Sequence, residues 1–288
     1  MTERLADVVE RIDNMRQLNA VLTAMRGIAA AHTQQSRDLL KAIEAYTDAI
    51  SQAISRALTF TPAPAQRHSV DPEKRGLVLF CAEQGFAGAF TDRILDSAAQ
   101  EIGSGFRSAK LLLIGTRGAA IAAERGLSSV WQTSMANQVG NVTDVAERVV
   151  AELYARIAKG EIVQVDVFFS RADPSHTLLV KHVRLLPVER ETFRIPAMPI
   201  LPLTTIKPEI LLACLIQEYI FAKLCEAAMH SLAAENEARM QSMSAATDNI
   251  DRTLRDLTQR ENAVRQEEVT AEIVELAAGV EARNGNHR

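Results

Sequence analysis

The strongest constraint on the fold comes from two long stretches, one at each end of the chain, that lack helix-breaking residues. Residues 2–60 hold no proline and one glycine, Gly27, and no proline follows Pro208. A helix loses about 3 kcal/mol for an interior proline and about 1 kcal/mol for an interior glycine, so both stretches permit uninterrupted helices. Apolar residues recur in both at every third or fourth position, the spacing of one helix face. We therefore predict one long helix at each end.

The two predicted helices each carry a single apolar stripe. In the N-terminal helix the stripe is Leu5, Val8, Ile12, Met15, Leu39, Ile43, Tyr46, Ile50, Ala53 and Ala57. In the C-terminal helix it is Met240, Met243, Thr247, Ile250, Leu254, Leu257 and Val264, followed by a shifted phase through Val269, Ile273, Leu276 and Val280. At about 1.5 Å per residue the C-terminal helix would be about 110 Å long, which exceeds any ordinary globular core.

Pairing the two helices covers both stripes most simply. The region between them can bring the chain back alongside itself, so an antiparallel coiled coil follows. The N-terminal helix is the shorter one, and the last part of the C-terminal helix should extend past it. Its apolar end would be poorly soluble alone, so we expect a partner surface around it.

The middle of the chain follows a different pattern. Candidate strands cover 77–81, 111–114, 163–169 and 178–188, and candidate helices cover 92–102, 117–125 and 142–159, the last capped by Asn141 or Thr143. This alternation predicts a small Rossmann-like α/β domain with a largely parallel sheet. The expected organisation is a helix over 1–60, a proline-rich linker over 61–75, the α/β domain over 76–196, a second linker over 197–207 and a helix over 208–288. The predicted fold class is thus α/β, a long antiparallel coiled coil flanking a Rossmann-like α/β domain.

Composition excludes several classes of function. The 32 basic and 36 acidic residues give a net charge of −4, which argues against nucleic-acid binding. The three cysteines have no CxxC spacing and lie in apolar stretches, so we expect buried thiols in a reducing compartment. No segment approaches the roughly 20 apolar residues that span a bilayer, and the six histidines lack ligand spacing. We expect no metal, no cofactor and no direct bilayer insertion.

The sequence also gives little support for a catalytic site. The segment 85–88 follows a strand and precedes a helix, so its amides could hold an anion, although a tight turn explains its glycines better. The segment 115–118 allows the same two interpretations, with the turn again favoured. Asp173, Ser175 and His176 are adjacent in sequence without forming a triad, and a turn between strands explains them. We predict no catalytic residue in this chain.

The terminal helices carry recognisable motifs. Residues 234–249 read AENEARMQSMSAATDN, and residues 262–273 read NAVRQEEVTAEI. They resemble the "SE...ARM.AM..ATDNA" and "N.ARQ..IT.EI.EI" motifs of the gamma subunit of rotary F-type ATP synthases. Residues 11–31 are similar to that family's "RI.S.......TKAM.MVAA". The resemblance covers essentially the whole chain, with both motif regions in the right order.

The middle of the chain matches the family less closely. Residues 167–170, 185–187 and 114–118 fit its "F.S", "LLP" and "IG.KG" elements, whereas residues 82–91 depart from "S.DRGLCGG.N". Gly27 stands where methionine is usual, and His32 and Thr33 replace lysines. These departures indicate a divergent branch, an alternative or sodium-translocating version of the enzyme. The coupling ion is selected by the membrane ring and cannot be inferred from this chain.

The resemblance implies a non-catalytic central-stalk rotor that transmits torque between a membrane ion-translocating ring and a catalytic head making or hydrolysing ATP. It implies contacts with three alpha and three beta subunits, the epsilon subunit and the membrane c-ring. It also implies a peripheral location at the cytoplasmic face of the inner (plasma) membrane. The implied partner-binding or coupling residues are Met25, Glu235, Arg239, Arg265, Gln266, Thr270 and Glu272, and the implied bearing tip is Ile273, Leu276 and Val280.

The chemistry of these residues leaves alternatives open. Arg265 and Gln266 supply donors and an acceptor suited to angle-dependent contacts, although a solvated helix face has the same composition. Glu235 and Arg239 have helix-pair spacing, worth about 0.2–0.5 kcal/mol if exposed. Met25 fits a partner contact or the coiled-coil seam equally. The alternative function is a soluble coiled-coil scaffold with a ligand-binding α/β domain, and an enzyme acting through the segment 85–88 is a weaker third.

Overall fold

The computed structural model describes residues 4–60, 74–172, 178–194 and 204–285, without the side chains of 172 and 278–285. The chain divides into two compact units. We call residues 1–28 with 241–288 the two-helix unit, and residues 29–240 the α/β unit. The division therefore falls inside both long helices, whereas the sequence suggested boundaries at two linkers. Most of each linker, 61–73 and 197–203, lies outside the described residues, and so does the turn predicted at 173–176.

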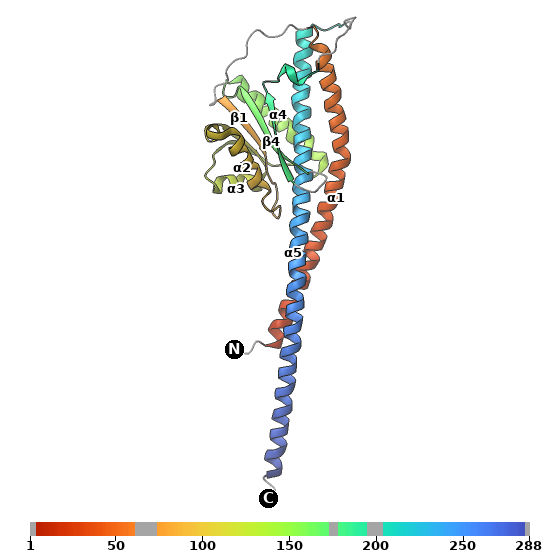
Figure 1. Ribbon diagram of the computed structural model, residues 1–288, viewed down its shortest axis with the longest axis vertical. Coiled ribbons are helices and arrows are strands. Elements are labelled where there is room, and N and C mark those ends of the chain that lie inside the picture. The colour runs from red at the N-terminus through yellow and green to blue at the C-terminus, as the bar shows by residue number, and fades with distance from the viewer. Residues whose placement is uncertain (1–3, 61–73, 173–177, 195–203, 286–288) are drawn as a thin grey trace. The chain divides into compact units, whose positions relative to one another are not determined.

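Two long helices confirm the main prediction. Helix α1 spans Leu5–Ala57 and helix α5 spans Pro208–Gly285 (Figure 1). Proline suits the first turn of a helix because its missing N–H would be unpaired there anyway. The helices run antiparallel in each unit: in the two-helix unit Val8 and Ile12 cluster with Leu257, and Leu22 further along α1 clusters with Met243.

The seam in the α/β unit differs from the predicted stripe. Leu39 and Tyr46 are each 46% exposed, so their assignment to the covered face was wrong. The buried positions of α1 there include Thr33, Ser36 and Thr47. Each hydroxyl donates to the carbonyl four residues earlier, which satisfies it without any partner outside the helix.

One five-stranded sheet has the order β3-β2-β1-β4-β5. Its strands are β1 (Arg75–Phe80), β2 (Lys110–Ile114), β3 (Ser129–Thr133), β4 (Gln164–Ala172) and β5 (Leu178–Leu186). Strands β1 to β4 pair in parallel and β5 pairs antiparallel to β4, which confirms the largely parallel sheet. The edge strand β3 was not predicted, and β1 begins within the expected linker.

Helices cover both faces of this sheet. Helix α2 (Phe90–Ile102) and helix α3 (Thr116–Glu124) pack on one face, and helix α4 (Val142–Ala158) packs with part of α5 on the other (Figure 1). Short 3₁₀ turns cover Gly103–Phe106, Val139–Asn141 and Arg190–Thr192. The predicted cap of α4 is wrong: Asn141 makes no side-chain capping bond, because the preceding 3₁₀ turn gives it a near-helical backbone where a cap needs an extended one. Thr143 lies inside the helix.

Helix α5 is the central element of the α/β unit. Every residue from Ala227 to Arg239 is buried, so the helix has no solvent face over that length. Its apolar residues form one cluster with those of the sheet and α4, and Leu40 and Ile43 of α1 pack against that cluster. Such all-round burial is typical of a helix inside a core.

The cysteine prediction was correct for two residues of three. Cys81 and Cys225 are buried, and burial raises the pKa of each thiol to about 12. Cys214 is exposed, because it lies on the outer side of α5 near the start of that helix.

Candidate functional site

The polar coupling residues predicted near the end of α5 all lie at the surface. Arg265, Gln266, Thr270 and Glu272 are exposed. The Arg265 guanidinium lies 2.7 Å from the carboxylate of Glu261, one turn earlier. The Thr270 hydroxyl donates to the Gln266 carbonyl at 2.7 Å. The Gln266 side chain and the remaining guanidinium donors are thus displayed on an outer helix face, where a partner could reach them.

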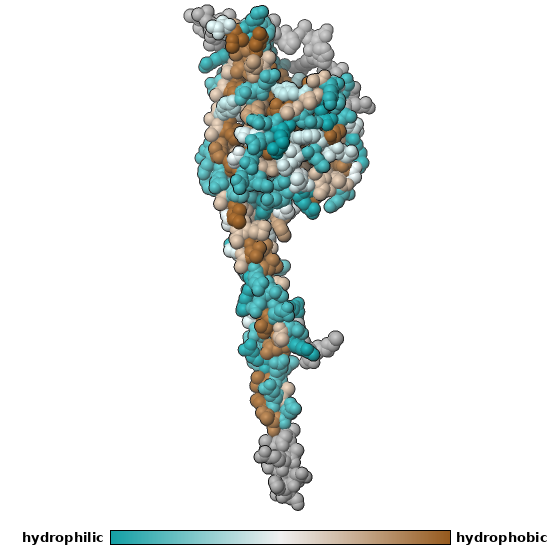
Figure 2. Space-filling view, turned by 180° about the vertical axis from the view of Figure 1, so that it is seen from behind, coloured by the Kyte–Doolittle hydropathy of each residue, from teal (hydrophilic) through white to brown (hydrophobic). Residues whose placement is uncertain are grey.

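Apolar residues of the same segment are exposed as well. Val269 and Val274 are 49% and 62% exposed, and the predicted tip residues Ile273 and Leu276 are 60% and 71% exposed. In Figure 2 hydrophobic colour reaches the surface just before the grey end of α5. Val280 belongs to the helix, but its side chain lies outside the described residues. Several large apolar side chains within two turns form a surface patch that is typical of a protein contact site.

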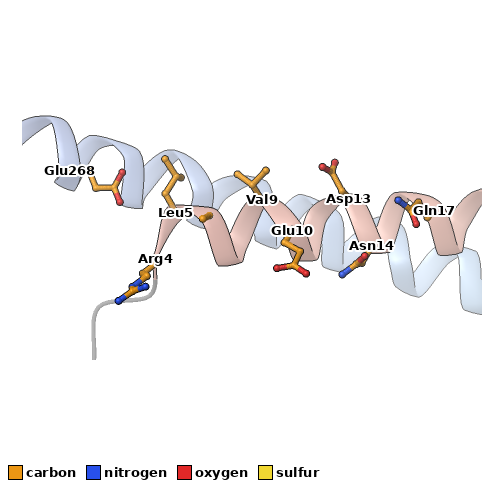
Figure 3. Close-up of a pocket in the computed structure, with 9 residues that line it drawn as sticks. Arg4, Leu5, Val9, Glu10, Asp13, Asn14, Gln17 and Glu268 are labelled. Carbon is orange, nitrogen blue, oxygen red and sulfur yellow. The ribbon is translucent and has the colours of Figure 1, made fainter.

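A shallow groove runs beside the first turns of α1, and Glu268 of α5 lines the end of it that lies next to Arg4 and Leu5 (Figure 3). The labelled side chains diverge: Val9 and Asp13 project to one side of α1, while Glu10 and Asn14 project to the other. Small-molecule sites need polar groups that converge on one point within an enclosed apolar cavity. This groove therefore does not resemble a ligand pocket.

Met25 lies in the seam of the two-helix unit. It is half-buried and packs against the cluster of Leu22, Met243 and Ile250. Met243 is 1% exposed, which confirms its predicted packing role, whereas Met240 is only partly buried. Met25 thus contributes to the seam and also keeps a surface that a partner can contact.

Glu235 and Arg239 form a buried cluster with the loop after β1. Their side chains are 3% and 8% exposed and lie 2.5 Å apart, so the exposed pair assumed from the sequence is wrong. The Glu235 carboxylate accepts hydrogen bonds from the backbone N–H groups of Glu83 at 3.2 Å and Gln84 at 3.1 Å. The Arg239 guanidinium donates to the Gly85 carbonyl at 3.3 Å. Burial raises the pKa of Glu235, while Arg239 and the two amides act in the opposite direction.

Glu83 extends this cluster across neighbouring loops. Its carboxylate accepts hydrogen bonds from the backbone N–H of Thr116 at 2.9 Å and of Met135 at 2.8 Å. Thr116 opens α3 after β2, and Met135 follows β3. The side-chain amide nitrogen of Gln84 also donates to the side-chain oxygen of Asn137 at 3.2 Å. The loops that follow three parallel strands are therefore joined at one edge of the sheet.

That edge is where open α/β sheets usually bind ligands. The chain passes from β1 outward to β2 and β3 and then returns to β4 on the other side of β1, so the change of direction lies between β1 and β4. Helix α5 occupies the position at the end of β1: the Ser231 hydroxyl donates to the Phe80 carbonyl at 3.0 Å, and Glu235 follows one turn later. The crevice is thus filled by the chain itself.

The two glycine-containing turns fit this arrangement. Gly88 and Phe86 have φ of 57° and 62°, which supports a tight turn over 85–88. The backbone N–H groups that bind an anion belong to Glu83 and Gln84, just before this turn, and the anion is the Glu235 carboxylate. A Cβ on Gly118 would lie 2.1 Å from the Cβ of Cys81, so this glycine permits close packing of α3. Among the described residues, His, Cys, Asp and Glu form no group of three placed to hold a metal ion.

Sequence reasoning missed several members of the buried cluster. Asn236 accepts from Arg239 at 2.9 Å, and buried Glu237 pairs with Arg37 of α1 at 3.2 Å. The available signal was the set of charged and amide residues Glu235, Asn236, Glu237 and Arg239, which directly follows the apolar residues 232–234. That signal locates buried polar groups but does not identify their partners.

Comparisons with known proteins agree along the whole chain. A family model described as ATP synthase matches residues 4–282. The ATP synthase gamma chain of Clavibacter michiganensis is 26% identical, with 98% of both chains covered. That of Beutenbergia cavernae is 28% identical, with 95% of this chain and 96% of the relative covered.

Solved structures show the same fold. A chain of the Euglena gracilis mitochondrial ATP synthase, in a structure of OSCP, F1 and c-ring, has a TM-score of 0.68 at 10% identity, covering 99% of this chain and 96% of that one. A chain from the central stalk and c-ring of the Tetrahymena thermophila mitochondrial ATP synthase has a TM-score of 0.55 at 17% identity, covering 78% of this chain and 99% of that one.

Proposed function

This chain belongs to the ATP synthase family, in which it is a gamma chain and a rotor of the central stalk, and we propose that the exposed end of α5 is its contact with the catalytic head. The observation that carries the proposal is the surface patch around Ile273 and Leu276, 60% and 71% exposed, beside four exposed polar residues. As a rotor, the gamma chain transmits torque between a membrane ion-translocating ring and a catalytic head that makes or hydrolyses ATP.

The apolar and polar parts of this segment suit different tasks. Apolar contacts are non-directional, so Ile273, Leu276 and Val280 would form a bearing that does not hold one angle. Arg265, Gln266, Thr270 and Glu272 would form contacts that differ between orientations, because hydrogen bonds weaken steeply when misaligned. Both sets would face a ring of three alpha and three beta subunits. Met25, Glu235 and Arg239 would contribute to coupling further along the two helices.

The remaining contacts and the location also form part of the proposal. We infer that the chain carries out no chemistry, since Glu235 and Arg239 fill the crevice in which an α/β sheet would bind a substrate. The α/β unit would contact the epsilon subunit and the c-ring. Over the described residues, none of the helices combines the length and apolar character required to cross a bilayer. The complex would hold the chain at the cytoplasmic face of the inner (plasma) membrane.

Substituting both Arg265→Ala and Gln266→Ala tests the contact with the head. We expect a lower ATPase turnover of the reconstituted complex with an unchanged circular dichroism spectrum, because both side chains are exposed and their loss leaves the fold intact. Arg260→Ala, an exposed arginine earlier on α5, is the matched control and is expected to keep turnover. Equal turnover in the double variant and the control would contradict the assignment of these two residues.

A further inference from the structure

We propose that Glu235 and Arg239 form a clasp that fixes the loop after β1 to α5, so that the sheet and this part of the helix turn as one body. The clasp is the set of contacts from these two side chains to the backbone of residues 83–85. The inference rests on the proposed rotor function and adds a route for torque within the chain.

The clasp has a defined chemical polarity. The loop presents two N–H donors, from Glu83 and Gln84, and one carbonyl acceptor, from Gly85. Glu235 supplies only acceptors and Arg239 supplies only donors, so each side chain matches the backbone group that it meets. The order of the two charges along α5 is therefore fixed by the loop, and an inverted pair would place donors against donors.

Small residues allow the loop and the helix to approach. Ala234 and Ala238, which are 0% and 5% exposed, alternate with the clasp residues and pack in the cluster that contains Ala82 and Ala87 of the loop. The Arg239 guanidinium is also held from the side by Asn236 at 2.9 Å. Close apolar contact excludes water around the charged groups, which strengthens their hydrogen bonds.

Directional bonds have a mechanical role that the apolar core does not fill. The apolar contacts between α5 and the sheet oppose separation, and the clasp adds directional hydrogen bonds that select one arrangement of helix and loop. Buried ion pairs contribute little net stability compared with apolar residues of similar volume, and their clearest use is to specify one arrangement. Glu83 passes the constraint on to α3 and to the loop after β3. A clasp at this position therefore locks the angle between helix and sheet.

Hydrogen exchange of the full chain tests the clasp without requiring rotor activity. For Glu235→Ala we expect amide exchange at Glu83 and Gln84 to accelerate about 10- to 100-fold, the effect of losing hydrogen bonds to a charged acceptor. Glu226→Ala is the matched control, because Glu226 pairs with Lys223 on the same helix at 2.8 Å and is expected to leave this loop protected. If the alanine variant does not fold, Glu235→Gln keeps one acceptor and should deprotect the loop to a smaller extent.

A charge swap separates the clasp from a simple helix pair. Glu235→Arg combined with Arg239→Glu keeps opposite charges one turn apart but reverses their polarity toward the loop. We expect this double variant to leave the loop as unprotected as Glu235→Ala does. Restored protection in the swap would overturn the proposal, since a helix pair alone would then suffice.

The mechanical role of the clasp can be tested in the reconstituted complex by measuring ATP hydrolysis and ion transport together. We expect Glu235→Ala to hydrolyse ATP while transporting fewer ions per ATP than the wild type and Glu226→Ala. An unchanged transport ratio together with a deprotected loop would overturn the clasp as a torque route. A complex assembled without this chain that couples as well as the wild type would instead refute the proposed function, and the exchange result would not depend on that outcome.

Discussion

The same two helices form two different seams in the two units. In the two-helix unit, α1 and α5 meet along one stripe of large side chains, including Ile12, Leu22, Ile250 and Leu257. In the α/β unit, α5 is buried on every side from Ala227 to Arg239, and the buried face of α1 includes Thr33 and Ser36. A helix that must pack against another helix and a sheet needs small residues, and its polar groups require local partners.

The two seams differ in how many elements enclose them: two helices form one, whereas a sheet and further helices surround α5 in the other. A two-helix seam can relax after a side chain is lost, because solvent lies close on both sides. A helix enclosed by other elements has no such freedom, so a cavity or an unpaired group persists. Mutations of equal chemistry should therefore cost more in the α/β unit, and the following predictions test that comparison.

The largest effect is expected for Leu224→Ala. Leu224 is 0% exposed and packs in the cluster between α4, α5 and the sheet. We expect the free energy of unfolding to fall by about 3–5 kcal/mol, the upper part of the range for leucine truncation. Urea denaturation followed by circular dichroism measures it. A loss under about 1 kcal/mol would show that the enclosed helix can collapse around a cavity.

A pH-dependent effect of slightly smaller size is expected from His230. Its ring stacks on Phe169 at 5.7 Å, and its Nε2 lies 3.7 Å from the Glu44 carboxylate. Burial lowers the pKa of His230 to about 4, and Arg171 and Lys223 act in the same direction. The unfolded chain binds a proton below pH ~6.5, whereas the folded chain resists protonation down to about pH 4. The stability present above that window should be lost as the pH falls through it, by about 3 kcal/mol.

Comparison with His230→Leu isolates this contribution. Both proteins lose stability in acid through their carboxyl groups, so the informative quantity is the difference between their unfolding free energies at pH 7 and at pH 4.5. The wild type should lose more than the leucine variant over that interval. Parallel pH profiles would mean that the folded chain protonates His230 as readily as the unfolded chain does.

The smallest of the three effects is expected for Ile250→Ala in the two-helix seam. Ile250 is 7% exposed and contacts a narrow cluster that includes Leu22 and Met243. We expect a loss of about 2 kcal/mol, the lower limit for such truncations, because the open seam can close around the gap. A loss equal to that of Leu224→Ala would remove the distinction between the two seams.

Sequence periodicity predicted the elements that bury one apolar face. Both long helices were identified from the spacing of their apolar residues, and four of the five strands from short apolar runs, which in β1 and β2 are buried almost throughout. Strand β3 was missed because its five residues at a sheet edge alternate between partly buried and exposed positions and include Ser129 and Gln132. The α1 seam was assigned incorrectly at Leu39 and Tyr46 because Thr33 and Ser36 do not register as apolar, although their hydroxyls bond within the helix.

For the candidate site, the sequence predicted the exposed end of α5 but not the burial of Glu235. Exposure of the α5 end follows from the unequal helix lengths, which the sequence shows directly. Burial of Glu235 depends on two backbone N–H groups about 150 residues away, and their position is set by the fold of the sheet. Local spacing therefore suggested an exposed helix pair, whereas tertiary structure placed the same residues against a loop.

The unequal environments of the cysteines make one position accessible to chemical labelling. Of the three thiols, Cys81 and Cys225 are buried and Cys214 alone is exposed. Thiol reagents attack the thiolate and require access, so a maleimide should attach at Cys214 without prior removal of the other two. Because Cys214 lies on α5, a fluorophore or bead placed there would report the orientation of that helix in an otherwise unmodified chain.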